Sequence, residues 1–319
     1  MDHPRPRPPG QPADHLVVAD EVSAALADGR DVVALESTII SHGLPSPQNV
    51  ETALACVAHV RASDAVPATV AVIDGSLRVG LSIDEIERLG SEKVAKASLR
   101  DLGYLLAEGR TGSTTVAATL FASHRAGIRL FATGGIGGVH RGDDHDISAD
   151  LTALATMPVA VVCAGVKAVL DLPRTVEALE TLGVPIVGQG TDVVPEFWTR
   201  GGDLPVSVRS DLPNTTAEIL HAHWACGLPS GVVVANPIPV TDEADPQAIA
   251  DAIVGGLAAA DAAGVHGRDV TPFLLAHIGQ TTRGASLEAN VALVKHNAAV
   301  AAEIAVALAT LPTLGVGRN

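Results

Sequence analysis

Short runs of apolar, largely β-branched residues recur along the chain and limit the folds that it can adopt. Each run is apolar throughout instead of alternating with polar residues, which is typical of strands covered on both faces. Such strands occur in largely parallel sheets with helices on either side. The six runs span residues 31–37, 68–74, 128–133, 158–164, 184–189 and 231–236. The pattern therefore predicts an α/β fold.

The segments between these runs carry helix signals. Ser46 followed by Pro47 predicts a capped helix that continues to about residue 62. Ser82 and Glu85 form the pattern of a capping box, in which each side chain binds the backbone amide of the other residue, ahead of a helix that ends near residue 90. An Ala-rich segment from residue 286 to about 310 predicts a long helix that closes the core.

One turn signal adds an antiparallel pair of strands. The dipeptide Asp74-Gly75 between two apolar runs is typical of a two-residue hairpin. We therefore expect residues 15–319 to form a single three-layer α/β domain with a mixed, largely parallel sheet flanked by helices. Residues 1–14 are rich in proline and have no apolar leader segment, so we expect a disordered arm there.

Charge and cysteine content restrict the partners. The chain has 36 acidic and 21 basic side chains, a formal net charge of −15, which argues against binding a nucleic-acid polymer. A small anionic substrate in one local pocket stays compatible with this charge. No apolar stretch reaches the roughly 18 residues that a membrane span needs, so we expect no membrane partner. Three widely spaced cysteines fit neither a disulfide framework nor a zinc site, which favours the cytoplasm.

Lys167 is the charged residue with the most apolar surroundings, in PVAVVCAGVKAVLDL. Only four of the 21 basic residues are lysines, so each position is informative. One interpretation is a packed stem whose ammonium group reaches water. The other is a desolvated lysine with a lowered pKa, whose neutral amine attacks a carbonyl and forms a Schiff base. The position just after a strand is where α/β folds bind ligands.

Glu36 ends the first apolar run and precedes the loop SHGLPSPQ. A glutamate at a strand end commonly pairs with a nearby arginine. The alternative is a general acid, because an apolar environment favours the protonated carboxyl. The second interpretation gains support from the other candidate residues that fall at strand ends.

Residues 132–151, ATGGIGGVHRGDDHDISADL, combine a glycine-rich turn with a cluster of carboxylates. The spacing GxGxxG of a dinucleotide-binding turn is missing. Asp143, Asp144, Asp146 and Asp150 form either a solvated acidic loop or a site for a hard ion such as Mg²⁺ or Mn²⁺. Asp146 and Asp150 are four residues apart at the start of an expected short helix, so we expect them on one face.

Two segments are candidates for binding an anion. Lys96 supplies a positive charge in KVAKASLRDL. The segment TGSTTVAATL is expected to start a helix, where Gly112, Ser113, Thr114 and Thr115 would offer amides and hydroxyls. Ordinary N-capping explains the second segment equally well.

The blocks ALESTIISHGLPSPQN, VPATVAVI, FATGGIGGVHRG, DISADL, VVCAGVKAVLDL, ETLGVPIVG, ANPIP and TPFLL cover most of the chain from about residue 30 to residue 300. Together they resemble the pseudouridine-5′-phosphate glycosidase family, also called indigoidine synthase A proteins. The resemblance implies an enzyme that reversibly cleaves the carbon–carbon glycosidic bond of pseudouridine 5′-phosphate, giving uracil and ribose 5-phosphate. It also implies a homotrimer.

The resemblance further implies roles for individual residues. Lys167 falls at the position of the Schiff-base lysine, and Glu36 at that of the proton-transferring glutamate. The implied substrate-binding residues are Lys96, Val116, Thr133, His140, Ser148, Ala149, Asp150 and Asn290. Asp146 falls at the position of the metal-binding aspartate, with Mn²⁺ as the ion and Mg²⁺ or another divalent ion as the alternative. The loop 142–146 is shorter than the family pattern, and His145 replaces an expected aromatic residue.

Two other functions fit the same residues. One is a metal-dependent sugar-phosphate hydrolase or isomerase that uses the Asp146 loop, with Lys167 in a structural role. The other is a non-catalytic nucleotide-binding protein that keeps only the phosphate contacts.

Overall fold

The centre of the protein is an 11-stranded sheet, seen in a computed structural model that describes residues 15–142, 146–265 and 270–312. All six predicted runs contain strands of this sheet, so the expected α/β class is confirmed. The strands are β1 (Leu16–Val18), β2 (Val32–Leu35), β3 (Val66–Ile73), β4 (Ser76–Val79), β5 (Ala95–Ala97), β6 (Gly112–Thr114), β7 (Leu130–Ala132), β8 (Ala160–Cys163), β9 (Ile186–Gln189), β10 (Val208–Ser210) and β11 (Val232–Ala235).

The strand order is β1-β4-β3-β2-β7-β8-β11-β9-β10, with β6 on β3 and β5 on β6. Most neighbours are parallel, whereas β3 pairs antiparallel with both β4 and β6. Every residue of β2, β3, β7, β8 and β11 is buried, which explains why these runs are apolar throughout. The expected mixed, largely parallel sheet is therefore confirmed.

The β3–β4 hairpin turns at the predicted dipeptide. Asp74 and Gly75 have φ angles of 47° and 75°, the left-handed conformations that a type I′ turn requires. Glycine adopts such angles without strain, and aspartate tolerates them better than most residues. The antiparallel element that the sequence predicted is confirmed.

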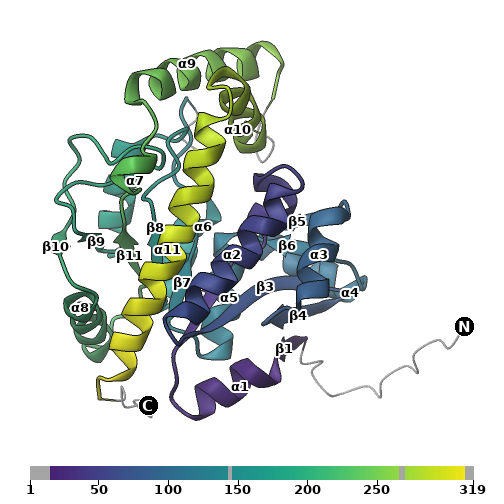
Figure 1. Ribbon diagram of the computed structural model, residues 1–319, viewed down its shortest axis with the longest axis vertical. Helices are drawn as coiled ribbons and strands as arrows, with labels where there is room; N and C mark the ends of the chain where they lie inside the picture. Colours follow the sequence, from purple (N-terminus) through teal and green to yellow (C-terminus); the bar gives the residue numbers. More distant parts are fainter. Residues whose placement is uncertain (1–14, 143–145, 266–269, 313–319) are drawn as a thin grey trace, which may run out of the picture.

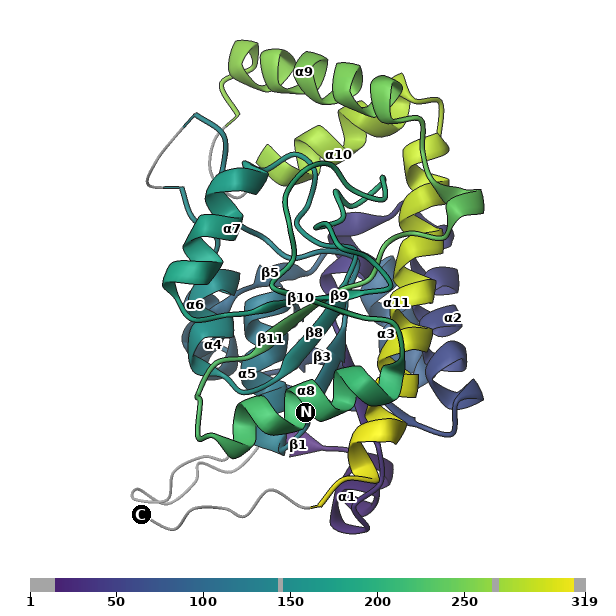
Figure 2. The ribbon, with the colours of Figure 1, turned by 90° about the vertical axis from the view of Figure 1, so that its left-hand side faces the viewer.

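Helices cover both faces of the sheet. Figure 2 shows α2 and α11 on one side of the strands and α4, α5 and α6 on the other. In Figure 1, α9 and α10 pack together at one end of the molecule, beyond the sheet. The helices are α1 (Asp20–Ala27), α2 (Gln48–Ala62), α3 (Ile83–Ser91), α4 (Leu99–Ala107), α5 (Val116–Ala126), α6 (Ala149–Thr156), α7 (Leu172–Thr181), α8 (Pro213–Ala225), α9 (Pro246–Ala262), α10 (Val270–Thr281) and α11 (Ala285–Ala309).

Three of these helices test the start signals in the sequence. The capping box of Ser82 and Glu85 is present at α3. The long helix α11 is present and packs against α2, α8 and the sheet. The expected start of α2 is wrong by about one residue, because Pro47 occupies the N-cap position and Ser46 makes no cap. A short π-helix, η1 (Ile39–Gly43), precedes α2.

The segment Gly112–Thr114 is a strand, β6, and not the expected start of a helix. The amide of Thr114 donates to Ser37 Oγ at 2.9 Å, and Thr114 Oγ1 donates to the carbonyl of Val70 at 2.6 Å. These contacts with residues distant in the sequence outweigh the local helix-start signal. The helix begins only after Thr115, whose side chain caps α5.

Among the described residues, α11 is the one helix long and apolar enough to cross a membrane by length and composition. More than half of its most apolar window is buried inside the protein. Its contacts with α2, α8 and the sheet are those of a core helix. The N-terminal arm, residues 1–14, lies outside the described residues.

Candidate active site

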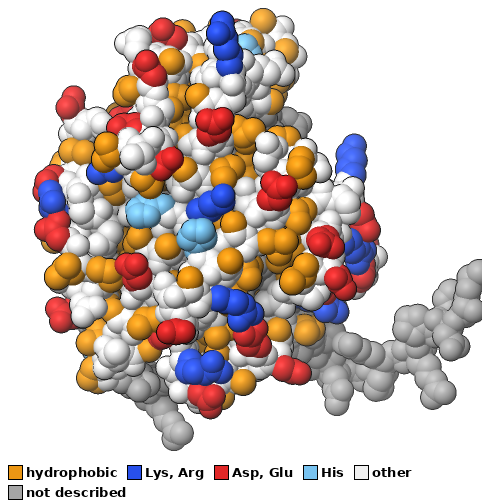
Figure 3. Space-filling view, in the orientation of Figure 1, with side chains coloured by type: hydrophobic (Ala, Val, Ile, Leu, Met, Phe, Trp, Pro, Cys, Tyr) orange, Lys and Arg blue, Asp and Glu red, His pale blue; other side chains and the backbone are white. Residues whose placement is uncertain are grey.

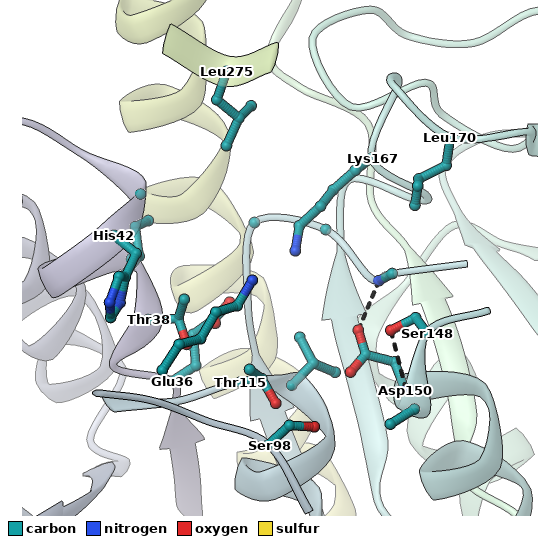
Figure 4. A pocket seen from close by; sticks show the side chains of 18 of the residues that line it. Glu36, Thr38, His42, Ser98, Thr115, Ser148, Asp150, Lys167, Leu170 and Leu275 are labelled. Carbon is teal, nitrogen blue, oxygen red and sulfur yellow. Dashed lines mark hydrogen bonds between the residues drawn. The ribbon is translucent and has the colours of Figure 1, made fainter. Parts of the chain in front are cut away.

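A cavity of about 490 Å³ lies where neighbouring strands of the sheet end. Its wall comes mainly from the loops that follow β2, β5, β6, β7 and β8, with Leu275 of α10 and Asn290 of α11. Figure 4 shows Lys167 pointing into the cavity, with Glu36 and His42 on the opposite side. This is the sheet edge at which α/β folds bind ligands.

The structure brings the predicted site residues together although they lie far apart in the sequence. Ten of them line the cavity: Glu36, Lys96, Val116, His140, Asp146, Ser148, Ala149, Asp150, Lys167 and Asn290. Thr133 does not line it, but its hydroxyl donates a hydrogen bond to Glu36 Oε1. Of the other candidates, Thr115 lines the cavity, Gly112, Ser113 and Thr114 do not, and Asp143 and Asp144 lie outside the described residues.

Glu36 follows the buried strand β2 and is itself half-buried. Burial raises the pKa of the Glu36 carboxyl, and Asp150 acts in the same direction. The positive charge of Lys167, the hydroxyl of Thr133 and the positive charge of Lys96 act against this rise. A carboxyl with a raised pKa that stands among cationic groups can both hold and release a proton, as a general acid requires.

Lys167 lies in a tight turn after β8 and is half-buried. Its amide donates to the carbonyl of Ile136 at 3.1 Å, and the amide of Ile136 donates to the carbonyl of Gly165 at the same distance. Gly165 has a φ of 79°, and a Cβ atom there would lie 2.0 Å from the carbonyl oxygen of Pro195. Only glycine fits this turn, which holds Lys167 between the glycine-rich loop and the loop of Pro195.

Asp150 joins the glycine-rich loop to the start of α5. Its carboxylate accepts hydrogen bonds from the backbone amides of Ala117 at 2.9 Å and Gly137 at 2.8 Å. A Cβ atom on Gly137 would lie 2.3 Å from Ser148 Oγ, so the loop packs against this wall only with glycine there. Both carboxylate oxygens of Asp150 therefore have backbone partners, and a dashed line in Figure 4 marks one hydrogen bond to this carboxylate.

Asp146 lies at the rim of the cavity, with 34% of its side chain exposed. The helix α6 begins only at Ala149, so the expectation that Asp146 and Asp150 share one helical face is wrong. Asp146 Oδ1 is 3.5 Å from His140 Nδ1, and its backbone carbonyl accepts from the amide of His140 at 2.9 Å.

Could Asp146 hold the metal ion that the sequence suggested? Within the described ranges, no three His, Cys, Asp or Glu side chains cluster as a metal site. The acidic residues 143 and 144 and His145 lie outside those ranges. Mg²⁺ and Mn²⁺ are often held by one or two carboxylates together with water and a substrate phosphate. The single rim carboxylate of Asp146 fits that mode of binding.

Lys96 and Arg100 place positive charge in the wall of the cavity. Lys96 is on β5, and Arg100 is in the first turn of α4, after Ser98. The backbone amide of Ser98 donates to Asp101 Oδ2 at 3.0 Å, which fixes the start of this helix. This is the part of the wall best suited to a phosphate group.

The structure adds lining residues that the sequence did not single out. Ser98 and Arg100 are two and four residues after Lys96, and the cap signal S-x-x-D at Ser98 could have revealed them. His42 lies on η1, where burial and the charge of Lys96 lower the pKa of its imidazole. Phe197 has a φ of 64°, rare for an aromatic residue, and nothing in the local sequence signals it.

On the face in Figure 3, acidic and basic side chains are interspersed, and the basic ones form no continuous patch. A polymer of phosphates needs such a patch.

Comparison with known proteins gives consistent matches over most of the chain. The family model described as "Indigoidine synthase A like protein" matches residues 21–307. A protein of Methylobacterium nodulans named pseudouridine-5′-phosphate glycosidase is 56% identical over 92% of this chain and 88% of its own length. A protein of Hahella chejuensis with the same name is 54% identical over 91% of this chain and 97% of its own length.

Solved structures share the fold. A prealnumycin C-glycosynthase in complex with ribulose 5-phosphate has a TM-score of 0.86 and 40% identity, covering 94% of this chain and 98% of its own. An indigoidine synthase A-like protein of Thermotoga maritima has the same TM-score and 33% identity, covering 94% and 99%. These matches confirm the resemblance drawn from the sequence blocks. The chain belongs to the indigoidine synthase A-like family of enzymes.

Proposed function

We propose that this protein is a pseudouridine-5′-phosphate glycosidase that works through a Schiff base on Lys167. The observation that carries the proposal is the meeting of Lys167 and Glu36 in one cavity, in a chain 50–56% identical to several proteins of that name. The substrate is a small phosphorylated nucleotide, and the products are uracil and ribose 5-phosphate.

The leaving atom explains why a lysine is needed. An ordinary glycosidase uses two carboxylates and a leaving group whose heteroatom accepts a proton. Here the sugar is bonded to carbon C5 of uracil, so departure of the base needs a stronger electron source. The amine of Lys167 attacks C1′ and displaces the ring oxygen O4′, which takes up a proton as the ribose ring opens. The nitrogen's electron pair then forms the iminium as the C1′–C5 bond breaks and C5 takes up a proton. Water then hydrolyses the iminium to free ribose 5-phosphate.

Glu36 delivers the proton that uracil C5 takes up as the bond breaks. Its environment suits this role, because burial favours the acid form while the charge of Lys167 opposes it. Once Lys167 is a neutral amine, that opposing influence is gone and the protonated form of Glu36 is favoured further. The loss of charge on the nucleophile therefore prepares the proton donor.

The remaining wall residues bind the rest of the substrate. Lys96, with Arg100 beside it, receives the 5′-phosphate through charge-assisted hydrogen bonds. Val116, Ser148, Ala149 and Asp150 bind the sugar, and His140 and Asn290 bind towards the base. Thr133, which does not line the cavity, acts there through its hydrogen bond to Glu36. Asp146 would hold Mn²⁺, or Mg²⁺ in its place, and the bound ion would supply positive charge to the site.

Two further expectations belong to this proposal. We propose that the enzyme is cytoplasmic and acts as a homotrimer. A hydrolase or isomerase with a structural Lys167, or a protein that binds nucleotide without turnover, would also occupy this cavity. Each differs from the glycosidase in what happens at Lys167.

The deciding experiment combines turnover with trapping. Release of uracil from pseudouridine 5′-phosphate is measured with and without a chelator. In parallel, ribose 5-phosphate and borohydride should add a reduced sugar-phosphate mass to the peptide that contains Lys167. Labelling that persists in Lys167→Ala would refute the nucleophile, and full activity of that variant would favour the hydrolase or isomerase. Saturable binding without turnover, even with added Mn²⁺, would favour the binding protein.

A further inference from the structure

Two buried asparagines join the ends of three strands behind the cavity. Asn236 follows β11 and Asn297 lies on α11, and their side chains are 3% and 0% exposed. Asn236 Nδ2 donates to Asn297 Oδ1 at 2.9 Å, and the backbone amide of Asn236 donates to the carbonyl of Cys163 at 2.8 Å. Asn297 Nδ2 in turn donates to the carbonyl of Thr133 at 2.8 Å.

Thr133 is the link between this buried network and the cavity. Its backbone amide donates to the carbonyl of Val162 at 3.0 Å, and its carbonyl accepts from Asn297. Its side-chain hydroxyl donates to Glu36 Oε1. Both backbone groups of Thr133 are held, which fixes the point of the backbone from which its hydroxyl reaches Glu36. A buried carbonyl that loses its donor carries a cost of about 1–3 kcal/mol, so the backbone would shift to recover a partner.

We propose that Asn297 is a positioning residue that holds Thr133 in the orientation from which its hydroxyl reaches Glu36. This inference rests on the proposed role of Glu36 as proton donor. Asn297 is not among the residues that line the cavity, so it acts through Thr133 and not on the substrate.

The charged groups around Glu36 determine how its pKa would change if the hydrogen bond from Thr133 were lost. Lys167 and Lys96 favour the carboxylate, whereas Asp150 and burial favour the acid. The hydroxyl of Thr133 belongs with the lysines, since its hydrogen bond lowers the pKa of Glu36. Without that bond burial acts with less opposition, so the pKa of Glu36 rises further above its ordinary value.

The test measures the titration of Glu36 in the free enzyme. Protein labelled with ¹³C at the glutamate carboxyls is titrated by NMR, and the Glu36 signal is identified by its loss in Glu36→Gln. In Asn297→Ala, we expect the Glu36 titration to move to higher pH and kcat to fall, with KM little changed. Thr133→Val should produce the same shift. The two changes together should shift the titration no more than either alone, because both remove one hydrogen bond.

A control variant separates positioning from general loss of stability. Thr216→Val removes a fully buried hydroxyl on α8 that binds Gln189 Oε1 at 2.7 Å and Ser210 Oγ at 2.8 Å. It should leave the Glu36 titration where it is. If Asn297→Ala does not fold, Asn236→Ala withdraws the donor that orients the Asn297 amide and should give a smaller shift in the same direction.

An unchanged Glu36 titration in Asn297→Ala, or shifts that add with those of Thr133→Val, would overturn the positioning role. The proposed function fails differently: the wild-type enzyme would then give no borohydride-trapped product on Lys167.

Discussion

The Asp150 carboxylate should stabilise the fold more than any other acidic group in the cavity wall. In Asp150→Asn, the side-chain oxygen can still accept from one of the two amides, of Ala117 and Gly137, and the new NH₂ group faces the other. The variant thus loses one charge-assisted hydrogen bond, about 1.5–3 kcal/mol, and leaves a buried amide unpaired. It also loses the favourable interaction of a negative charge with the start of α5, about 0.3–1 kcal/mol. We expect unfolding free energy to fall by about 2–4 kcal/mol.

Asp146→Asn is the matched control, because it makes the same chemical change at the exposed rim. We expect it to alter unfolding free energy by no more than about 0.5 kcal/mol. Urea unfolding of the two variants and the wild type, followed by circular dichroism, gives the comparison. The two variants should rank in the opposite order for activation by Mn²⁺: Asp146→Asn should lose the increase in activity that added Mn²⁺ gives. The reasoning about Asp150 is refuted if its substitution costs no more stability than that of Asp146.

Three further predictions concern the same cavity. Gly137→Ala should lower the unfolding free energy by about 1–3 kcal/mol, because the new Cβ meets Ser148. Gly103→Ala in α4 is the control: its Cβ meets nothing within 4 Å, so it should raise the unfolding free energy by about 0.5–1 kcal/mol. Urea unfolding that gives the opposite order of stabilities would contradict this. Because the pKa of Glu36 is raised, the stability linked to this group is present at acidic pH and lost as pH rises through the folded-state pKa. The melting temperature of inactive Glu36→Gln should therefore rise relative to that of the wild type as pH increases. A difference between the two melting temperatures that does not change with pH would contradict the raised pKa. Lys96→Ala should raise KM for pseudouridine 5′-phosphate about 10-fold or more but leave KM for unphosphorylated pseudouridine almost unchanged. Equal effects on the two KM values would show that the phosphate binds elsewhere.

Long apolar runs were predictable because burial on both faces leaves a local pattern. The strands β2, β3, β7, β8 and β11 were all recognisable for that reason. The strand β6 was not, since its three residues Gly-Ser-Thr carry no apolar pattern and pair with β3, β5 and the side chain of Ser37. Short strands of this kind depend on distant partners that the local sequence does not name.

The candidate site was predictable where a reactive side chain stands next to a recognisable strand. Lys167 and Glu36 stood out because a charge next to an apolar strand is unusual. Asn297 and Asn236 did not, because a polar residue in a helix or turn is normally solvated, and only the fold reveals that the two amides meet. Asp150 was found for the wrong geometric reason, since its partners are backbone amides and not a second carboxylate on the same face.

The place of α11 in the chain has a consequence for biosynthesis. This helix follows all the strands of the sheet in the sequence, yet it covers β2, β7 and β8 and packs against α2. A growing chain therefore emerges with the strands already made and one apolar face of the sheet still uncovered. Such intermediates aggregate readily and are typical clients of chaperones. Asn290 and Asn297 arrive with the same helix, so closure of the core and completion of the cavity are one event.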